Sequence, residues 1–119
     1  MNFKQTELGL IPEHWQYKTV SELIDEKVID KPLDGNHGGI HPTQKDFIED
    51  GIPFIMASDI IDGRVDYSRC KYISLDKSKE LKKGFAREGD VLLTHKATIG
   101  RVGIVGRIDT PYIVLTPQV

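Results

Sequence analysis

The sequence predicts an α+β fold in which a largely antiparallel sheet carries two or three short helices. Short apolar runs recur between glycine- and aspartate-rich turn signals, which is typical of brief strands. Strands late in the chain are joined by short turns, which favours antiparallel pairing of neighbours. Because no repeat or linker divides the 119 residues, residues 1–119 are expected to form one domain around a modest core.

The first third of the chain combines a short helix with a long loop. Apolar side chains recur at helical spacing over residues 20–28, and Thr19 or Ser21 can cap this helix. Residues 31–42, KPLDGNHGGIHP, contain three glycines and two prolines. This composition predicts a loop.

The middle of the chain alternates helix and strand signals. The segment QKDFIED, residues 44–50, predicts a helix of one or two turns that ends at Gly51. The apolar segment IPFIMA, residues 52–57, predicts a strand. The dipeptide Asp62-Gly63 is a turn signal, because both residue types tolerate the backbone angles of tight turns.

The second half of the chain is expected to be strand-rich. CKYISL, residues 70–75, alternates as a strand does, and DKSKELKKG, residues 76–84, predicts a short basic helix capped by Asp76. Further strands are expected at 90–95, 101–106 and 112–116.

Charge is distributed unevenly along the chain, although the net charge is only −2. Residues 1–63 carry 5 Lys/Arg and 12 Asp/Glu, whereas residues 64–107 carry 11 Lys/Arg and 5 Asp/Glu, a local net charge of +6. A basic patch on one face is typical of a protein that binds a polyanion. The alternative is a surface of scattered, solvated charges.

Composition also limits the setting of the protein. No apolar run approaches the ~20 residues that span a membrane, and residues 1–15 lack the apolar core of a signal peptide. Cys70 is the only cysteine and is expected to be a small strand residue. Since a lone cysteine forms no internal disulfide, a cytoplasmic protein with no membrane partner is expected.

A glycine-rich stretch could be interpreted as a phosphate-binding loop: residues 89–106, GDVLLTHKATIGRVGIVG. The order of its residues contradicts this interpretation. A phosphate-binding loop places lysine after the last glycine and opens a helix, whereas Lys96 precedes Gly100 and the sequence that follows has strand periodicity. The stretch therefore predicts a hairpin, with residues 96–100 joining two antiparallel strands. Val91 and Leu93 would share one face of the first strand, and Val102 and Ile104 one face of the second.

The histidines raise the possibility of a metal site. His37 and His41 are four residues apart, but Gly38 and Gly39 between them disfavour the helix that this spacing requires. No other cluster supplies the remaining ligands, and no Ser/His/Asp or Cys/His set can be identified from spacing. A small metal-dependent or nucleotide-using enzyme built on His37, His41 and His95 remains the alternative function.

Three segments together resemble the target recognition domain of type I restriction-modification specificity subunits. TELGLIPEHWQYKTVSELID, residues 6–25, resembles the family's entry segment, and GIPFIMASDIIDGRVD, residues 51–66, is similar to its Gly-x-Pro strand. GDVLLTHKATIGRVGIV, residues 89–105, is similar to its Gly-Asp…Thr-φ-Gly segment, where φ is an apolar residue. The resemblance covers nearly the whole chain.

The resemblance implies a non-catalytic module that reads one half of a split double-stranded DNA target. It implies a curved, largely antiparallel sheet, and partners that are the modification (methyltransferase) and restriction subunits. No cofactor is expected in this chain, because S-adenosylmethionine, ATP and magnesium serve those partners. The family's long spacer helix is not seen after residue 82, so a domain truncated near its C-terminus is expected. A recognition domain fused to a methyltransferase in one chain is a variant of the same function.

DNA recognition needs basic side chains for phosphates and polar side chains for base edges. Two loops, 34–45 and 95–101, carry the suitable residues, whereas Asp90, Thr98 and Gly100 of the family motif are expected to shape the hairpin. The base-reading candidates are Asn36, His37, Gln44, Lys45, His95, Lys96, Thr98 and Arg101. The phosphate-contacting candidates are Arg64, Lys82, Lys83 and Arg87.

Overall fold

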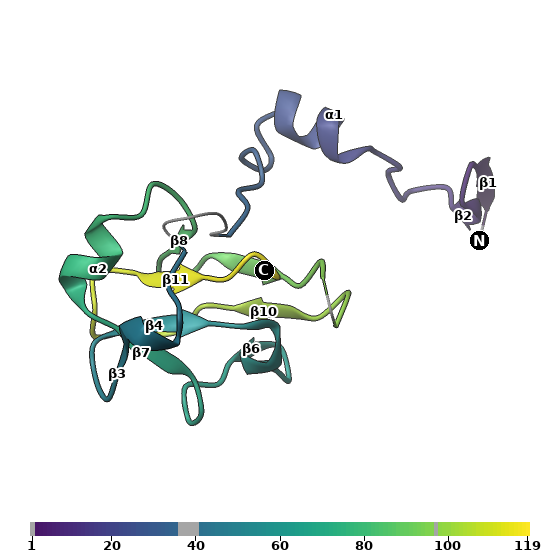
Figure 1. Ribbon diagram of the computed structural model, residues 1–119. Helices are drawn as coiled ribbons and strands as arrows, with labels where there is room; N and C mark the ends of the chain where they lie inside the picture. The colour runs from purple at the N-terminus through teal and green to yellow at the C-terminus, as the bar shows by residue number, and fades with distance from the viewer. Residues whose placement is uncertain (1, 36–40, 97) are drawn as a thin grey trace. The chain divides into compact units, whose positions relative to one another are not determined.

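A computed structural model describes residues 2–35, 41–96 and 98–119 (Figure 1). The base-reading candidates Asn36 and His37 lie outside the described residues. The chain divides into two compact units, Met1–Pro32 and Leu33–Val119, and each is described by itself.

The first unit contains a hairpin and a short helix. Strands β1 (Phe3–Thr6) and β2 (Gly9–Pro12) pair antiparallel, in a segment where no strand was predicted. Helix α1 (Val20–Asp25) is capped by Thr19, whose hydroxyl accepts a hydrogen bond from the Glu22 N–H group. The helix ends earlier than predicted, because Lys27 adopts a left-handed conformation with φ of 62°.

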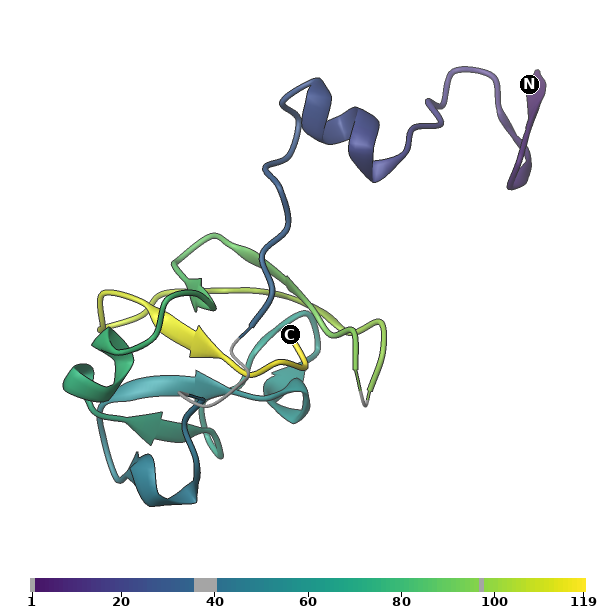
Figure 2. The same cartoon turned by 45° about the horizontal axis from the view of Figure 1, so that its top comes forward.

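The second unit is built from two sheets (Figure 2). One sheet has the strand order β3-β7-β4-β11-β8 and the other the order β5-β6-β10-β9. The strands of the first sheet are β3 (Phe47–Ile48), β4 (Ile52–Ile55), β7 (Lys71–Ile73), β8 (Phe85–Ala86) and β11 (Ile113–Leu115). Those of the second are β5 (Ile60–Ile61), β6 (Arg64–Val65), β9 (Val91–Leu93) and β10 (Val102–Ile104).

The core lies on both faces of the five-stranded sheet. Ile55 and Leu115 pack in one cluster with Leu92 of the four-stranded sheet, whereas Phe54 and Val114 pack in a second cluster with Leu81. Because alternate side chains of a strand point to opposite faces, both faces of β4 and β11 are buried. This burial explains why β4 reads as a continuous apolar run in the sequence.

The predicted α+β fold with a largely antiparallel sheet is confirmed, with two exceptions to antiparallel pairing. Strand β11 pairs parallel with β4, and β10 pairs parallel with β6. The last predicted strand therefore does not continue the β9–β10 hairpin but lies in the other sheet.

Two predicted helices differ from those observed. Residues 44–50 form only a 3₁₀ turn, η1 (Gln44–Asp46), because Phe47 and Ile48 pair with Ile73 and Tyr72 of β7. Helix α2 spans Leu75–Lys79 and is capped by Ser74 rather than Asp76, with the Ser74 hydroxyl accepting from the Lys77 N–H group. Among the described residues, no helix is long and apolar enough to cross a membrane.

The hairpin predicted in residues 89–106 is confirmed. Val102 pairs with Leu93 and Ile104 with Val91, in antiparallel register. All four side chains are exposed, so the face that they share points to solvent. Leu92 on the opposite face is buried, and Gly103 beside it lies so close to Ile60 that a Cβ atom at residue 103 would lie 2.9 Å from Ile60 Cγ2.

Candidate nucleic-acid interface

The carboxyl ends of β4 and β11 form one edge of the second unit. The two strands run parallel, with Leu115 opposite Ile55, and the Thr116 N–H group donates to the Ile55 carbonyl at 3.0 Å. Segments 56–59 and 116–118 therefore leave the sheet at the same edge (Figure 1). Strand ends at a shared edge hold polar groups on a rigid support.

Gln118 joins this edge to the β9–β10 hairpin. Its side-chain Oε1 accepts a hydrogen bond from the Ala57 N–H group at 3.1 Å, beyond the end of β4. Its backbone carbonyl accepts from the His95 N–H group at 2.9 Å, just beyond β9. One residue near the C-terminus thus connects two segments that are far apart in the sequence.

The neck of the hairpin is closed by Thr94, which is fully buried. The Thr94 N–H group donates to the Arg101 carbonyl at 2.9 Å, and its hydroxyl accepts from the Arg101 N–H group at 2.8 Å. The Thr94 carbonyl also accepts from the Gly100 N–H group at 2.9 Å. Gly100 has φ of 91°, a conformation that favours glycine, so its role in shaping the turn agrees with the sequence-based expectation.

The segment formed by Asp34 and Gly35 meets the same edge. Gly35 is buried, and a Cβ atom there would overlap the Thr116 carbonyl, so only glycine fits this approach. Asp34 Oδ1 lies 3.0 Å from His95 Nε2 and also accepts from the Gly35 N–H group at 2.9 Å. We call this site the loop junction; it consists of Asp34, Gly35, Thr94, His95, Thr116 and Gln118.

Asp34 is negatively charged in its environment at the loop junction. Partial desolvation opposes ionisation, but hydrogen bonds from Gly35 and His95 and the positive charge of Lys83 outweigh it. The hydrogen bonds and the nearby positive charge therefore hold the pKa of the Asp34 carboxyl below its usual value of 3.8. The Asp34 and His95 side chains are 42% and 40% exposed, so the pair is accessible at the surface.

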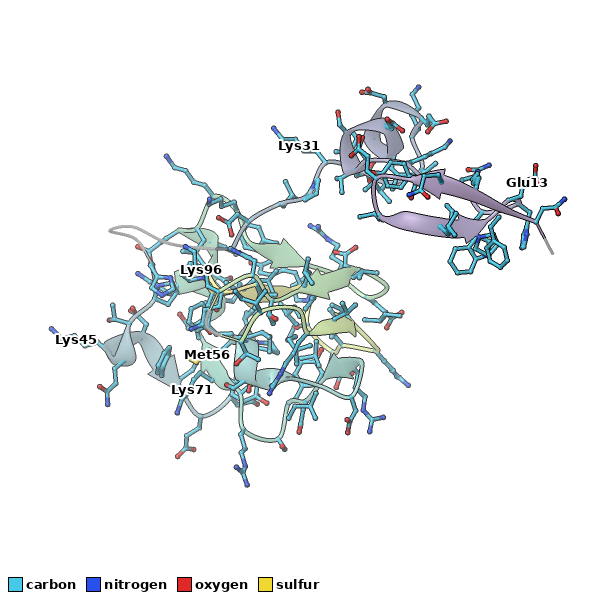
Figure 3. The ribbon with its side chains drawn as sticks, turned by 90° about the vertical axis from the view of Figure 1, so that its right-hand side faces the viewer. Glu13, Lys31, Lys45, Met56, Lys71 and Lys96 are labelled. Atoms are coloured by element: carbon cyan, nitrogen blue, oxygen red, sulfur yellow. The ribbon has the colours of Figure 1, made fainter. Side chains whose placement is uncertain are left out.

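Several predicted residues lie at or next to the loop junction. His95 belongs to it, and Lys96, labelled in Figure 3, follows directly. Lys96 and Thr98 are both exposed. Arg101 is exposed and donates from Nη1 to the Ile60 carbonyl at 3.3 Å. Lys83 acts electrostatically on Asp34, and the exposed Lys82 precedes it.

Gln44 and Lys45 lie at the opposite end of the sheet. Phe47 and Ile52 both pair with Ile73, so η1, which directly precedes Phe47, lies near the amino end of β4. Lys45 points away from the sheets there (Figure 3). The structure therefore does not bring these two candidates to the loop junction.

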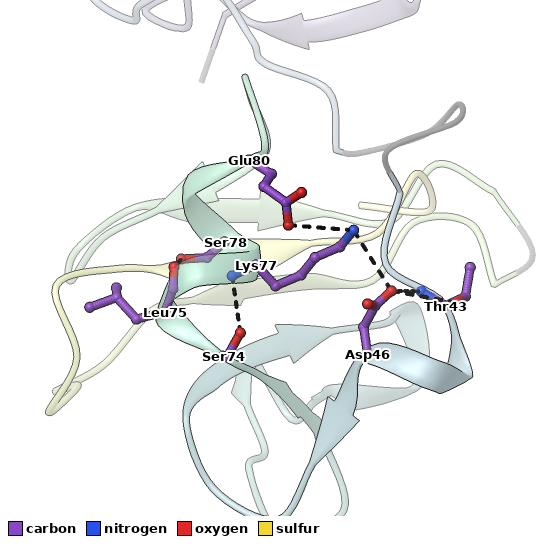
Figure 4. A network of polar contacts seen from close by, with 7 residues as sticks. All are labelled: Thr43, Asp46, Ser74, Leu75, Lys77, Ser78 and Glu80. Atoms are coloured by element: carbon purple, nitrogen blue, oxygen red, sulfur yellow. Dashed lines mark hydrogen bonds and ion pairs between the residues drawn. The ribbon is translucent and has the colours of Figure 1, made fainter.

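The turn η1 is instead tied to α2 by polar contacts (Figure 4). Asp46 Oδ2 accepts from the Thr43 N–H group at 2.9 Å and lies 3.9 Å from Lys77 Nζ. Lys77 Nζ also lies 3.8 Å from Glu80 Oε2. These contacts fit a structural role for this end of the predicted 34–45 loop.

Two phosphate candidates are also separated from the junction. Arg64 pairs with Ile61 and Ile104 in the four-stranded sheet and lies on its exposed face. Arg87 follows β8 at the amino end of β11, where its N–H group donates to Asp90 Oδ2 at 2.9 Å. Asp90 thus shapes a turn, as expected from its place in the family motif.

The histidines show no arrangement for metal binding within the described ranges. The His41 ring packs against Phe54, with ring centroids 5.5 Å apart, and His95 faces Asp34. In the part of the chain that the structure describes, no group of three or more His, Cys, Asp or Glu side chains is placed to hold a metal ion. Cys70 is buried beside strand β7, and desolvation raises the pKa of its thiol.

Asp34, Thr94 and Gln118 were not predicted as site residues. Their contacts join residues 61 apart in the sequence, as in Asp34–His95 and Ala57–Gln118, or bury a hydroxyl in a hairpin neck. Neither property can be recognised from neighbouring residues in the sequence. The one sequence feature that could have pointed to this site is the position of Asp34 at the start of a glycine-rich loop.

Comparisons with known proteins identify relatives of one kind. The chain is 36% identical over 121 residues to the type I restriction enzyme EcoBI specificity subunit of Escherichia coli, covering 92% of this chain and 24% of the relative. It is 30% identical to a putative type I restriction enzyme MjaX specificity subunit, covering 87% of this chain and 23% of the relative. It is 23% identical to the type I restriction enzyme MjaVIII specificity subunit, covering 94% and 25%. The last two are from Methanocaldococcus jannaschii.

The chain thus spans about a quarter of the length of the curated relatives that it matches. No protein-family model matches the chain, and no solved structure matches it. The relatives carry the family name that residues 6–25, 51–66 and 89–105 suggested. The resemblance is therefore confirmed: over about nine-tenths of its length, this chain is similar to the specificity subunits of type I restriction enzymes.

Proposed function

We propose that this chain is a DNA-recognition domain that reads one half of a bipartite target for a type I restriction-modification complex. The observation that carries the proposal is its similarity, over about nine-tenths of its length, to three type I specificity subunits. The proposed ligand is double-stranded DNA.

The loop junction offers the chemistry for this function. Lys83 and Lys96 bring positive charge to the edge where the hairpin and the segments after β4 and β11 converge. Lysines neutralise phosphates and release bound counterions, which makes affinity fall with salt. Lys82 and Lys83 are accordingly assigned to phosphates.

Arg101 and Lys96 are assigned to base edges. A guanidinium carries five N–H donors, and the contact of Arg101 Nη1 with the Ile60 carbonyl uses one of them. This contact restrains the side chain and leaves donors for the O6 and N7 acceptors of guanine. Thr98 supplies a further hydroxyl on the same hairpin.

Catalysis is assigned to other subunits. In this proposal the chain has no catalytic residue and positions a methyltransferase subunit and a restriction subunit on DNA in the cytoplasm. S-adenosylmethionine would bind the former, and ATP and magnesium the latter.

The test is a binding titration at two salt concentrations. A preferred duplex is first selected by the wild-type protein, assembled with its methyltransferase partner, from a random pool. Wild type, Lys96→Ala, Arg101→Ala and Lys83→Ala are then titrated with this duplex and with a scrambled one. Losing a base contact should cost ~1–3 kcal/mol on the target and little on the scrambled duplex. Lys83→Ala should weaken binding to both.

Selection of no preferred sequence by the assembled wild type would contradict the proposed function. An unchanged ratio of target to scrambled affinity in both Lys96→Ala and Arg101→Ala would show that the hairpin does not read bases. Methyl transfer or ATP hydrolysis by the purified chain alone would support an enzyme instead.

A further inference from the structure

We propose that Asp34 and His95 form a positioning pair that fixes the β9–β10 hairpin against the segment Asp34–Gly35, and that this link sets how well DNA sequences are discriminated. The inference rests on the proposed function and changes the role of His95 within it. His95 becomes a residue that orients the reading hairpin, rather than one that reads bases.

The contacts around the pair form a closed circuit. Asp34 Oδ1 meets His95 Nε2 at 3.0 Å, and the His95 N–H group donates to the Gln118 carbonyl at 2.9 Å. Thr116, two residues earlier, lies against Gly35, which follows Asp34. The side-chain pair therefore closes a circuit whose other links are backbone contacts.

Because these contacts form a closed circuit, the half-exposed Asp34–His95 pair has more influence on the position of the hairpin than an isolated surface pair would have. An isolated surface ion pair contributes little to stability, because two mobile side chains must be held together in water. Here the His95 backbone is hydrogen-bonded to Gln118, and Gly35, the neighbour of Asp34, lies against Thr116. Loss of the side-chain contact would leave the hairpin held at this junction by backbone contacts alone, so its tip could turn relative to DNA.

The first experiment measures the ratio of target to scrambled affinity for Asp34→Asn, His95→Gln and the double variant, each assembled with the methyltransferase partner. Each single variant should lower the ratio roughly 2- to 10-fold, the lower part of the range of coupling between residues in contact, because the pair is half exposed. The double variant should lower it no further, because either change opens the same circuit. Additive losses, or an unchanged ratio, would overturn the proposal.

His14→Gln serves as the control for this experiment. It is a change at an exposed histidine of the first unit, and it should keep the wild-type ratio of target to scrambled affinity.

The pair can also be detected without DNA. The imidazole Hε1 resonance of His95, assigned by its loss in His95→Gln, should shift in Asp34→Asn at pH 7, while the His14 resonance should not. An unmoved His95 resonance overturns the proposal even if the protein binds its target as proposed. If the resonance shifts but the protein selects no DNA target, the Asp34–His95 contact exists. Its role in recognition and the proposed function are then both rejected.

Discussion

Thr94 and Arg101 close the neck of the β9–β10 hairpin through two hydrogen bonds of opposite direction. The Thr94 N–H group donates to the Arg101 carbonyl at 2.9 Å, and the Arg101 N–H group donates to the Thr94 hydroxyl at 2.8 Å. Because Thr94 is fully buried, its hydroxyl replaces water as the partner of the Arg101 backbone. Arg101, which directly precedes β10, is therefore fixed at its backbone as well as through the contact of its guanidinium with the Ile60 carbonyl.

Replacing Thr94 by valine keeps the shape of the side chain but removes the hydroxyl that accepts from the Arg101 N–H group. The protein should be destabilised by about 1–3 kcal/mol, because this N–H group then has no acceptor. Urea denaturation measures the free energy of unfolding. Thr94→Ser is the matched control, since it keeps the hydroxyl and loses only a methyl group. A valine variant as stable as wild type, or a serine variant that is worse than valine, would show that the hydroxyl does not hold the neck.

The hairpin could be predicted because its signals are local. Gly100 and the apolar alternation lie within residues 89–106, and the observed register joins Leu93 to Val102 across a short turn. Asp62-Gly63 is a second such case, where φ angles of 52° and 80° match the predicted turn. In both, the residues that determine the structure are neighbours in the sequence.

The remaining features depend on distant partners. Phe47 and Ile48 follow a helix-like segment, but pairing with β7 makes them a strand. Strand β11 lies parallel to β4, about sixty residues earlier, and the resulting shared edge creates the loop junction. The sequence therefore predicts the hairpin that forms one side of the loop junction but not the position of Gln118, which follows from that long-range pairing.

Gly35→Ala should disrupt the loop junction, because the new Cβ atom would overlap the Thr116 carbonyl, which is backbone and cannot move aside cheaply. A destabilisation of about 1–3 kcal/mol is expected for an overpacked site. Gly106→Ala is the matched control, since nothing lies within 4 Å of its added methyl group. Thermal denaturation of both variants tests this. Equal melting temperatures for the two would mean that Gly35 does not make the close approach described.

Asp59 should make the free energy of unfolding fall as the pH rises. Burial is the largest cause that raises the pKa of its carboxyl, although the Met56 N–H group donates to Oδ2 at 2.9 Å. A group with a raised folded-state pKa stabilises the fold in its protonated form, and this stability is lost as the pH rises through that pKa. Asp59→Asn should therefore melt higher than wild type at pH 7, and the difference should disappear below pH 3.8, the ordinary value for aspartate.

Asp66 provides a control of opposite sign. The hydrogen bond from the Ser68 N–H group, at 2.9 Å, is the largest cause that lowers the pKa of Asp66. The stability that the ionised Asp66 contributes to the fold is fully present above its pKa in the unfolded chain. It is lost as the pH falls through the lower pKa that Asp66 has in the folded protein. Asp66→Asn should therefore melt lower than wild type at pH 7, with a difference that vanishes in acid. Melting curves of both variants at several pH values check the pair of predictions, and shifts of the same sign at pH 7 would contradict them.

Lys83 and Arg87 should differ in their effect on DNA binding, although only three residues separate them. Lys83 acts on Asp34 at the loop junction, whereas Arg87 lies near the amino end of β11, beyond the other end of β8. If the loop junction faces DNA, Lys83→Ala should reduce the slope of log affinity against log salt by about 1 on both target and scrambled duplexes. Arg87→Ala, which removes one positive charge as well, should leave the slope unchanged. Equal slopes for the two variants would mean that net charge, and not the edge formed by β4 and β11, determines how this chain approaches DNA.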